Sequence, residues 1–161
     1  MTTTRMLDSI DLYFDDFVIG DRFATRSRTI TEADIVAFAG LSGDYHPLHT
    51  DETFAVNGPF GARVAQGALT LSVASGLEFG LVNPSGTDES KVVAFYGLDR
   101  VRFVAPVFIG STIRVEGEIV ALEDKDETRG VITIRQEIKN ERDETVVVLD
   151  KRIVNRKRPK E

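Results

Sequence analysis

The chain of 161 residues contains no cysteine and no tryptophan, and only two histidines. The absence of cysteine excludes disulfides, thiolate catalysis and cysteine-ligated zinc. The 26 acidic residues outnumber the 20 lysines and arginines, and the net charge of -6 disfavours nucleic acid as the main partner, because phosphate binding needs a cationic surface. No apolar run approaches the roughly 20 residues of a membrane-spanning helix, and residues 1–10 lack the pattern of a signal peptide. We therefore expect a cytoplasmic protein with neither a nucleic acid nor a membrane as its partner.

The remaining composition is that of a globular protein, with 42% hydrophobic and 29% charged residues. The length suits one domain over residues 1–161, since the chain has no internal repeat and no interdomain linker. We expect residues 1–12 to form a loose N-terminus and residues 157–161 a loose tail.

The first half of the chain predicts one strand and several helices. The strand runs from Arg22 to Ile30, and a helix opens at Thr31, where Thr31 and Asp34 have the spacing of a capping box. Gly40 is expected to stop this helix. The longest apolar segment follows later and predicts a buried helix over 67–81, broken by Asn83-Pro-Ser-Gly86.

The second half predicts four long strands. Their ranges are Val92–Val104, interrupted around Gly97, Thr112–Glu123, with a bulge near Gly117, Gly130–Asn140 and Thr145–Asn155. A curved antiparallel sheet wrapped around one apolar helix satisfies this order, which is an α+β arrangement.

Between the first helix and the apolar helix lies a loop that holds both histidines, His46 and His49, with Asp44 and Pro47. A carboxylate and an imidazole on a loop stiffened by proline suit proton transfer. The same residues are also compatible with an ordinary turn, in which Asp and Pro are favoured for local reasons, or with a metal site built from His and carboxylate. Asp51 is expected to cap a short helix through Ala55.

The segment Ser42-Gly-Asp-Tyr-His-Pro-Leu-His-Thr-Asp51 resembles the hydratase motif of the MaoC-like dehydratases, the family of (R)-specific enoyl-CoA hydratases. The family pattern is Gly-Asp-x-Asn-Pro-hydrophobic-His-x-Asp. The segment from Gly58 to Gly67 is similar to the family's (Ile/Val)-Ala-His-Gly stretch, and the resemblance covers about residues 13–155.

This resemblance implies a hot-dog fold, in which the sheet wraps a long central helix at about 67–81, and a homodimer or higher homo-oligomer. It implies reversible syn addition of water to a trans-2-enoyl thioester, giving an (R)-3-hydroxyacyl thioester, as in fatty acid metabolism. Asp44 and His49 would activate the water and transfer protons, and the backbone N–H of Gly67 would stabilise the thioester oxygen. Ser72 matches a family position near the reacting centre. We expect no cofactor and no metal, because the acyl-CoA or acyl-carrier-protein thioester is itself the substrate.

Two positions depart from the family pattern. His46 replaces the usual Asn, as a residue that either orders the loop or touches the substrate, and Gln66 replaces the usual His. Pro47 and Asp51 match the pattern and are expected to order the loop.

Two other functions remain open on the same fold, a thioesterase and a non-catalytic partner subunit that binds acyl thioesters. The C-terminal basic cluster of Arg152, Arg156, Lys157 and Arg158 is compatible with either a coenzyme A phosphate site or a solvated tail.

Overall fold

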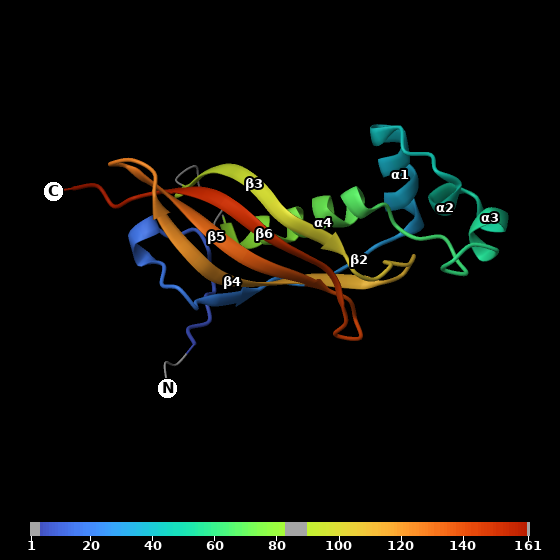
Figure 1. The fold of residues 1–161 in the computed structure, drawn as a ribbon, viewed down its shortest axis with the longest axis horizontal. Coiled ribbons are helices and arrows are strands. Elements are labelled where there is room, and N and C mark those ends of the chain that lie inside the picture. The colour runs from blue at the N-terminus through green and yellow to red at the C-terminus, as the bar shows by residue number, and fades with distance from the viewer. Residues whose placement is uncertain (1–3, 83–89, 161) are drawn as a thin grey trace.

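The computed structural model describes residues 4–82 and 90–160 of the chain, and its elements alternate little between helix and strand (Figure 1). In chain order they are a 3₁₀ turn η1 (Phe14–Asp16), β1 (Arg22–Ala24), β2 (Arg28–Thr29), α1 (Glu32–Ser42), α2 (Pro47–Thr50), α3 (Glu52–Val56), α4 (Gly67–Val82), β3 (Val92–Phe103), β4 (Thr112–Asp124), β5 (Arg129–Lys139) and β6 (Thr145–Arg156). The predicted order of helices followed by four long strands is confirmed.

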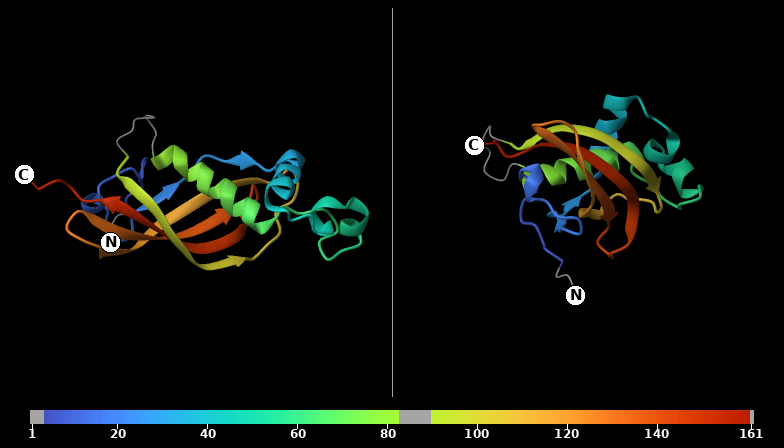
Figure 2. Two further views of the ribbon diagram at one scale, coloured as in Figure 1. Left: turned by 90° about the horizontal axis from the view of Figure 1, so that it is seen from above. Right: turned by 60° about the vertical axis from the view of Figure 1, so that its left-hand side comes forward.

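The strands form one antiparallel sheet in the order β1-β4-β5-β6-β3, and β2 pairs with β4. The sheet curves around α4, which lies along its concave side (Figure 2). The core forms where apolar side chains of α4 meet alternate residues of the strands, among them Leu69, Val73, Leu77, Ile119, Ile132, Ile134 and Leu149. The α+β prediction is therefore confirmed.

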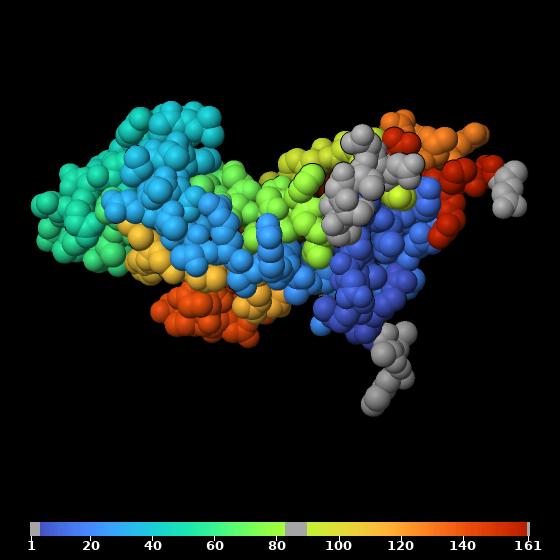
Figure 3. Space-filling model, turned by 180° about the vertical axis from the view of Figure 1, so that it is seen from behind, coloured from blue at the N-terminus to red at the C-terminus, as the bar shows by residue number. Residues whose placement is uncertain are grey.

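The central helix α4 is buried on one side only, although its small residues predict burial nearly all round. Ala68, Ser72, Ser75, Gly76 and Phe79 are exposed, and part of α4 reaches the surface between the N-terminal segment and β3 (Figure 3). The expected break at Asn83-Pro-Ser-Gly86 lies outside the described residues. Within residues 4–82 and 90–160, each helix falls short of the length and apolarity that crossing a bilayer requires.

Helix α1 begins as predicted but ends later. Thr31 accepts a hydrogen bond from the Asp34 N–H, and the Asp34 side chain accepts one from the Thr31 N–H, which completes the capping box. The predicted stop at Gly40 is wrong. The helix runs to Ser42 because the left-handed conformation that ends it is adopted by Gly43, at φ 78°.

The strand expected over Arg22 to Ile30 is divided into β1 and β2. Both pair with β4, Ala24 opposite Glu116 and Arg28 opposite Ile113. From Ala24 to Arg28 the chain advances four residues, whereas β4 advances only three, from Glu116 to Ile113. The first segment therefore has one extra residue, which interrupts the pairing with β4. Thr25 repairs the break, because its hydroxyl accepts a hydrogen bond from the Val115 N–H.

The bulge predicted near Gly117 lies slightly further along β4, between Ile119 and Ala121. Gly117 has a different role, since a Cβ atom there would lie 2.3 Å from Cζ of Phe23, a fully buried ring. The interruption predicted around Gly97 in β3 is present as a register shift between Phe95 and Gly97.

Both ends of the chain are attached more firmly than expected. Leu7 and Ile10 are buried, and the Leu7 N–H donates to the carbonyl of Arg22. At the other end the Lys157 N–H donates to the carbonyl of Thr128, and the Arg158 N–H donates to the Asp15 carboxylate. The prediction of loose ends is wrong over these residues, because apolar side chains and paired backbone groups hold them.

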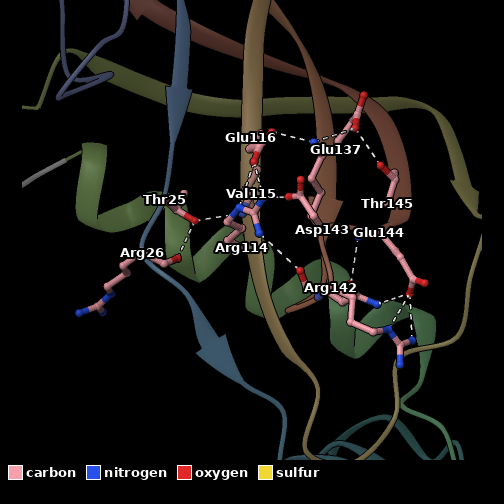
Figure 4. A network of polar contacts seen from close by, with 12 residues as sticks. Thr25, Arg26, Arg114, Val115, Glu116, Glu137, Arg142, Asp143, Glu144 and Thr145 are labelled. Carbon is pink, nitrogen blue, oxygen red and sulfur yellow. Dashed lines mark hydrogen bonds and ion pairs between the residues drawn. The ribbon is translucent and has the colours of Figure 1, made fainter.

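A polar network joins the β5–β6 turn to β4 (Figure 4). Arg114 donates to Glu116 and pairs with Asp143, while Glu144 accepts from Arg142. The carboxylates of Asp143 and Glu116 raise the pKa of the Arg114 guanidinium. This network holds the end of the sheet on the side away from α4.

We predict that Gly117→Ala destabilises the protein by about 1–3 kcal/mol, because the added methyl group overlaps the Phe23 ring. Gly97→Ala, with no atom within 4 Å of the added Cβ, should cost less than about 1 kcal/mol. Urea denaturation of the two variants measures both values, and an equal loss in each would refute the packing argument.

Candidate active site

The three short helical segments gather at one end of the molecule, next to the N-terminus of α4 (Figure 1). The segment between α1 and α2 carries Asp44, and α2 carries His49. Gly43 turns the chain out of α1, and the Asp44 N–H then donates to the hydroxyl of Ser42. The motif residues therefore lie on short, hydrogen-bonded segments rather than on a long loop.

Asp44 and His49 face each other, as the sequence predicts. Oδ2 of Asp44 lies 3.8 Å from Nε2 of His49. This distance exceeds a direct hydrogen bond and allows one water molecule to contact both atoms. The His49 side chain is 12% exposed and that of Asp44 46%, so the imidazole is held within the protein while the carboxylate reaches solvent.

The other ring nitrogen of His49 is fixed by the backbone. Nδ1 lies 2.7 Å from the carbonyl oxygen of Val64. A carbonyl oxygen can only accept, so Nδ1 carries the proton, and Nε2 of the neutral ring has a lone pair directed towards Asp44. Val64 is itself held by a bridge to Phe108 and by a hydrogen bond from its N–H to the carbonyl of Leu48.

His49 also lines a cavity of about 480 Å³. Its walls come from α2, the segment before α4, the first turn of α4 and residues 103–107, and include Phe60, Gly67, Ala68, Thr70 and Phe103. The walls are mostly apolar, which suits an apolar ligand whose reactive part lies against the few polar groups. The site can therefore place such a ligand beside an imidazole and a carboxylate.

His46 begins α2 and caps it. Its Nδ1 atom accepts a hydrogen bond from the Leu48 N–H at 3.1 Å, and an Asn side chain at the N-cap could accept the same bond. Asp51 caps α3 by accepting from the Phe54 N–H, and Pro47 occupies the first turn of α2. These contacts account for the loop-ordering roles expected of Pro47 and Asp51, and they give His46 a structural role in α2.

Arg63 lies in the segment before α4, and the structure gives it a role that the sequence does not predict. It donates to Glu32 in α1 and to Glu52 in α3, each at 2.7 Å. These carboxylates raise the pKa of the Arg63 guanidinium. Arg63 thus joins the two helices that flank Asp44 and His49. The role of Arg63 could have been suspected from the sequence, because it is an arginine in a short, otherwise apolar segment. The role of the Val64 carbonyl could not, because every residue has a backbone carbonyl.

The first turn of α4 presents free backbone donors at the same cavity. Among the described residues, no acceptor lies within hydrogen-bonding distance of the Gly67 or Ala68 N–H groups. A Cβ atom at Gly67 would lie 2.8 Å from the Phe103 ring, so a larger residue would force that exposed ring to move. Gln66, next to it, is buried and donates to the carbonyl of Ile35.

Ser72 is not part of this cavity. Its hydroxyl donates to the Ala68 carbonyl within α4, and the residue lines other hollows of the surface. The structure therefore brings together Asp44, His49 and Gly67 but leaves Ser72 outside, more than one helical turn further along α4.

The C-terminal basic cluster lies at the opposite end of the molecule from α2 and α3 (Figure 1). Arg152 pairs with Glu123, Lys157 with Asp124 and Arg158 with Asp16. These cations balance acidic residues of the same chain. In the described part of the chain, no three His, Asp or Glu side chains converge in a way that would hold a metal ion.

The hot-dog arrangement of sheet and helix and the Asp44–His49 site are both features of one protein family. The model of the MaoC-like domain family matches residues 16–141, and the chain belongs to that family.

Two relatives illustrate how far the similarity extends. Protein MaoC of Klebsiella aerogenes is 43% identical over 104 residues, which are 64% of this chain and 29% of that protein. The (R)-specific enoyl-CoA hydratase of Rhodospirillum rubrum is 34% identical over 144 residues, which are 88% of this chain and 94% of that protein. This chain thus spans less than a third of the MaoC protein but almost all of the hydratase.

Solved structures agree with the fold. A structure described as the monoamine oxidase regulatory protein of Archaeoglobus fulgius superposes with a TM-score of 0.85 at 43% identity, covering 97% of this chain and 99% of that chain. A Mycobacterium tuberculosis protein described as having a double hotdog fold superposes with a TM-score of 0.77 over 93% of this chain and 46% of that one. At 20% identity the second likeness concerns the fold alone. The hot-dog fold implied by the sequence motif is therefore confirmed.

We predict that His46→Ala destabilises the protein by about 1 kcal/mol, because it removes the acceptor that caps α2. His46→Asn should stay within a few tenths of a kcal/mol of the wild type, since Asn supplies the same acceptor. Urea denaturation and amide hydrogen exchange over residues 46–50 measure the difference. Equal losses in both variants would show that the imidazole ring, and not the cap, is what matters.

Proposed function

We propose that this protein is an enoyl-thioester hydratase/dehydratase, which adds water reversibly to a trans-2-enoyl thioester. The observation that carries the proposal is the pair of Asp44 Oδ2 and His49 Nε2, 3.8 Å apart, beside an apolar cavity. The similarity to the (R)-specific enoyl-CoA hydratase of Rhodospirillum rubrum supports the same reaction and its (R) stereochemistry.

The geometry suits activation of water. A water molecule between the two side chains can donate one hydrogen bond to the His49 Nε2 lone pair and one to the Asp44 carboxylate. One water O–H bond then breaks as the oxygen bonds to C3 of the enoyl group. The proton taken up by this pair of side chains passes to C2 on the same side, giving a 3-hydroxyacyl thioester by syn addition.

The thioester oxygen gains negative charge as water adds, and it needs fixed donors. The free N–H groups at the start of α4 supply them, at the end of a 16-residue helix where the backbone dipole favours an anion. Gly67 allows the thioester to approach this backbone closely. A thioester bound here has its enoyl group next to His49, since Gly67 and His49 line the same cavity.

The proposed enzyme is a homodimer that associates through β3, which lies at one edge of the sheet. An exposed edge strand with apolar side chains is a site for pairing with another strand. The apolar residues exposed in and just after β3 are Val93, Phe95, Tyr96, Leu98, Phe103 and Val104. Phe79 on the outward side of α4 extends this apolar surface. The cytoplasmic location stays a prediction.

With crotonyl-CoA, the wild-type protein should remove the enoyl-thioester absorbance without releasing free thiol. Asp44→Asn and His49→Ala should each lower kcat/KM by about 10³-fold or more, because each removes a group that contacts the reacting water. The double variant should be hardly slower than either single one, since the two side chains act on one water molecule.

The same assay separates other outcomes. Release of free thiol by the wild type would identify a thioesterase instead. No reaction with crotonyl-CoA or with longer and branched enoyl-CoA thioesters would indicate a non-catalytic partner subunit. An Asp44→Asn variant with most of the wild-type rate would refute the assignment of the site.

We predict that Val93→Lys combined with Val104→Lys converts the dimer into a monomer, because the added charges cannot be buried at a paired strand edge. Val18→Lys is the control, since Val18 is 59% exposed, compared with 44% for Val93 and 56% for Val104, but lies near the N-terminus. Sedimentation velocity measures the mass of each variant. A wild-type monomer, or a double variant that remains dimeric, would contradict the proposed interface.

A further inference from the structure

A second cavity, of about 360 Å³, lies further along α4 than the first. Its walls are formed by α4, β3, β5 and β6, and its apolar lining includes Leu71, Phe95, Leu98 and Leu149. Its polar lining consists of Ser72 and Ser75 on the exposed side of α4 and, deeper in the protein, of Glu78 from α4, Gln136 from β5 and Lys151 from β6.

The three deeper side chains form a buried cluster. Oε2 of Glu78 accepts a hydrogen bond from Lys151 Nζ and another from Gln136 Nε2, each at 3.0 Å. Glu78 and Gln136 are 2% exposed and Lys151 is 8% exposed. Burial raises the pKa of the Glu78 carboxyl, and the charge of Lys151 opposes that rise. A buried ion pair of this kind costs desolvation energy that an apolar pair of similar size would avoid.

The cluster keeps unused hydrogen-bonding capacity. Among the described residues, Oε1 of Glu78 and Oε1 of Gln136 have no hydrogen-bond donor. Lys151 Nζ makes one hydrogen bond and lies 5.3 Å from the centre of the Phe95 ring, although an ammonium group can donate three. All three residues line the cavity, so an occupant of the cavity can reach the free donors and acceptors.

The two cavities lie at successive positions along α4 and β6. Gly67 and Ala68 line the first, and Leu71 to Glu78 line the second. On β6, Val147 lines the first cavity and Leu149 and Lys151 the second, at alternate positions that point to one side of the strand. At 1.5 Å per residue, α4 extends about 16 Å from Gly67 to Glu78. An extended acyl chain bound at Gly67 can therefore lead to the cluster.

The charges of the cluster select among possible end groups. The charges of Glu78 and Lys151 cancel, so a charged end group would gain no net attraction to offset the loss of its hydration, and a neutral polar group suits the cluster better. A hydroxyl group can donate to the free oxygen of Glu78 and accept from Lys151. A plain alkyl end would leave these groups without partners.

We propose that the second cavity holds the far end of the acyl chain, and that Glu78, Gln136 and Lys151 select chains that carry a hydroxyl group there. This inference rests on the proposed hydratase function and names its substrate class: ω-hydroxylated trans-2-enoyl thioesters.

The test is a series of trans-2-enoyl-CoA thioesters of increasing length, each compared with its ω-hydroxylated counterpart. The wild type should prefer the hydroxylated member by about tenfold in kcat/KM at the length that reaches the cluster, and not at shorter lengths. In the double variant Glu78→Leu/Lys151→Met the preference should disappear or reverse. Equal rates for both members at every length, or an unchanged preference in the double variant, would overturn the inference.

Arg135→Met is the matched control. Arg135 pairs with Asp150, the neighbour of Lys151 that points to the other side of β6, so the variant removes an ion pair without touching the cavity. It should retain the full preference. If the double variant does not fold, Gln136→Leu, which removes a neutral member of the cluster, should lower the preference by itself, and an unchanged preference would overturn the inference.

Crotonyl-CoA separates failure of this inference from failure of the proposed function. The crotonyl group is too short to reach the cluster, so its hydration depends only on the first cavity. Hydration of crotonyl-CoA without any preference for hydroxylated chains would overturn the inference alone. If no enoyl thioester reacts, calorimetry with saturated ω-hydroxyacyl-CoA and acyl-CoA decides. Binding of the hydroxylated compound about tenfold more tightly supports the cluster's role, and equal binding or none overturns it.

Discussion

The hydrogen bond between His49 Nδ1 and the Val64 carbonyl is the contact on which the rest of the site depends. It sets the tautomer of the imidazole and so directs the lone pair of Nε2 towards Asp44. It also joins α2 to the segment that leads into α4. In that segment Val64 forms a bridge with Phe108, and the Ala65 N–H donates to the carbonyl of Val107. The orientation of His49 is therefore fixed by the connection between two strands of the sheet, β3 and β4. The Val64 carbonyl oxygen thus sets the position of His49, and with it the Asp44–His49 pair, relative to the free N–H groups at the start of α4.

Local sequence patterns predict the order of helices and strands well, and they predict the exact ends of these elements less well. The capping box of Thr31 and Asp34, the cap at Asp51 and the four alternating strands depend on neighbours in the sequence, and each is present. The stop predicted at Gly40 is wrong because the sequence does not show which glycine adopts the left-handed conformation, and the backbone shows that it is Gly43. Leu7 and Ile10 are held by backbone hydrogen bonds to Arg22 in β1 and to Leu81 in α4, and such long-range contacts cannot be read from a short polar segment.

Some residues of the candidate site can likewise be predicted from the sequence, and others cannot. The motif predicts that Asp44 and His49 meet, and the resemblance supplies Gly67. It does not predict that Ser72 points away from the cavity, because a helix of small residues offers no signal for which serine lies where. The roles of Arg63 and of the Val64 carbonyl also need the fold. Arg63 contacts residues 11 and 31 positions away in the sequence. His46 is the instructive case, since an apparent departure from the pattern keeps the same hydrogen bond to the Leu48 N–H.

Glu78 is the one charged residue between Gly67 and Val82, in a helix whose buried side is otherwise apolar except for Thr70. Local propensity does not require it there, and packing alone would favour an apolar side chain, because burying the pair with Lys151 is costly. The cost is partly offset by Gln136, which donates to the same carboxylate oxygen. The second oxygen is left for whatever fills the cavity. A carboxylate serving stability alone would have both oxygens paired, as Glu116 on β4 does with Arg114 and Lys139. The incomplete pairing at Glu78 therefore favours a binding role over a structural one.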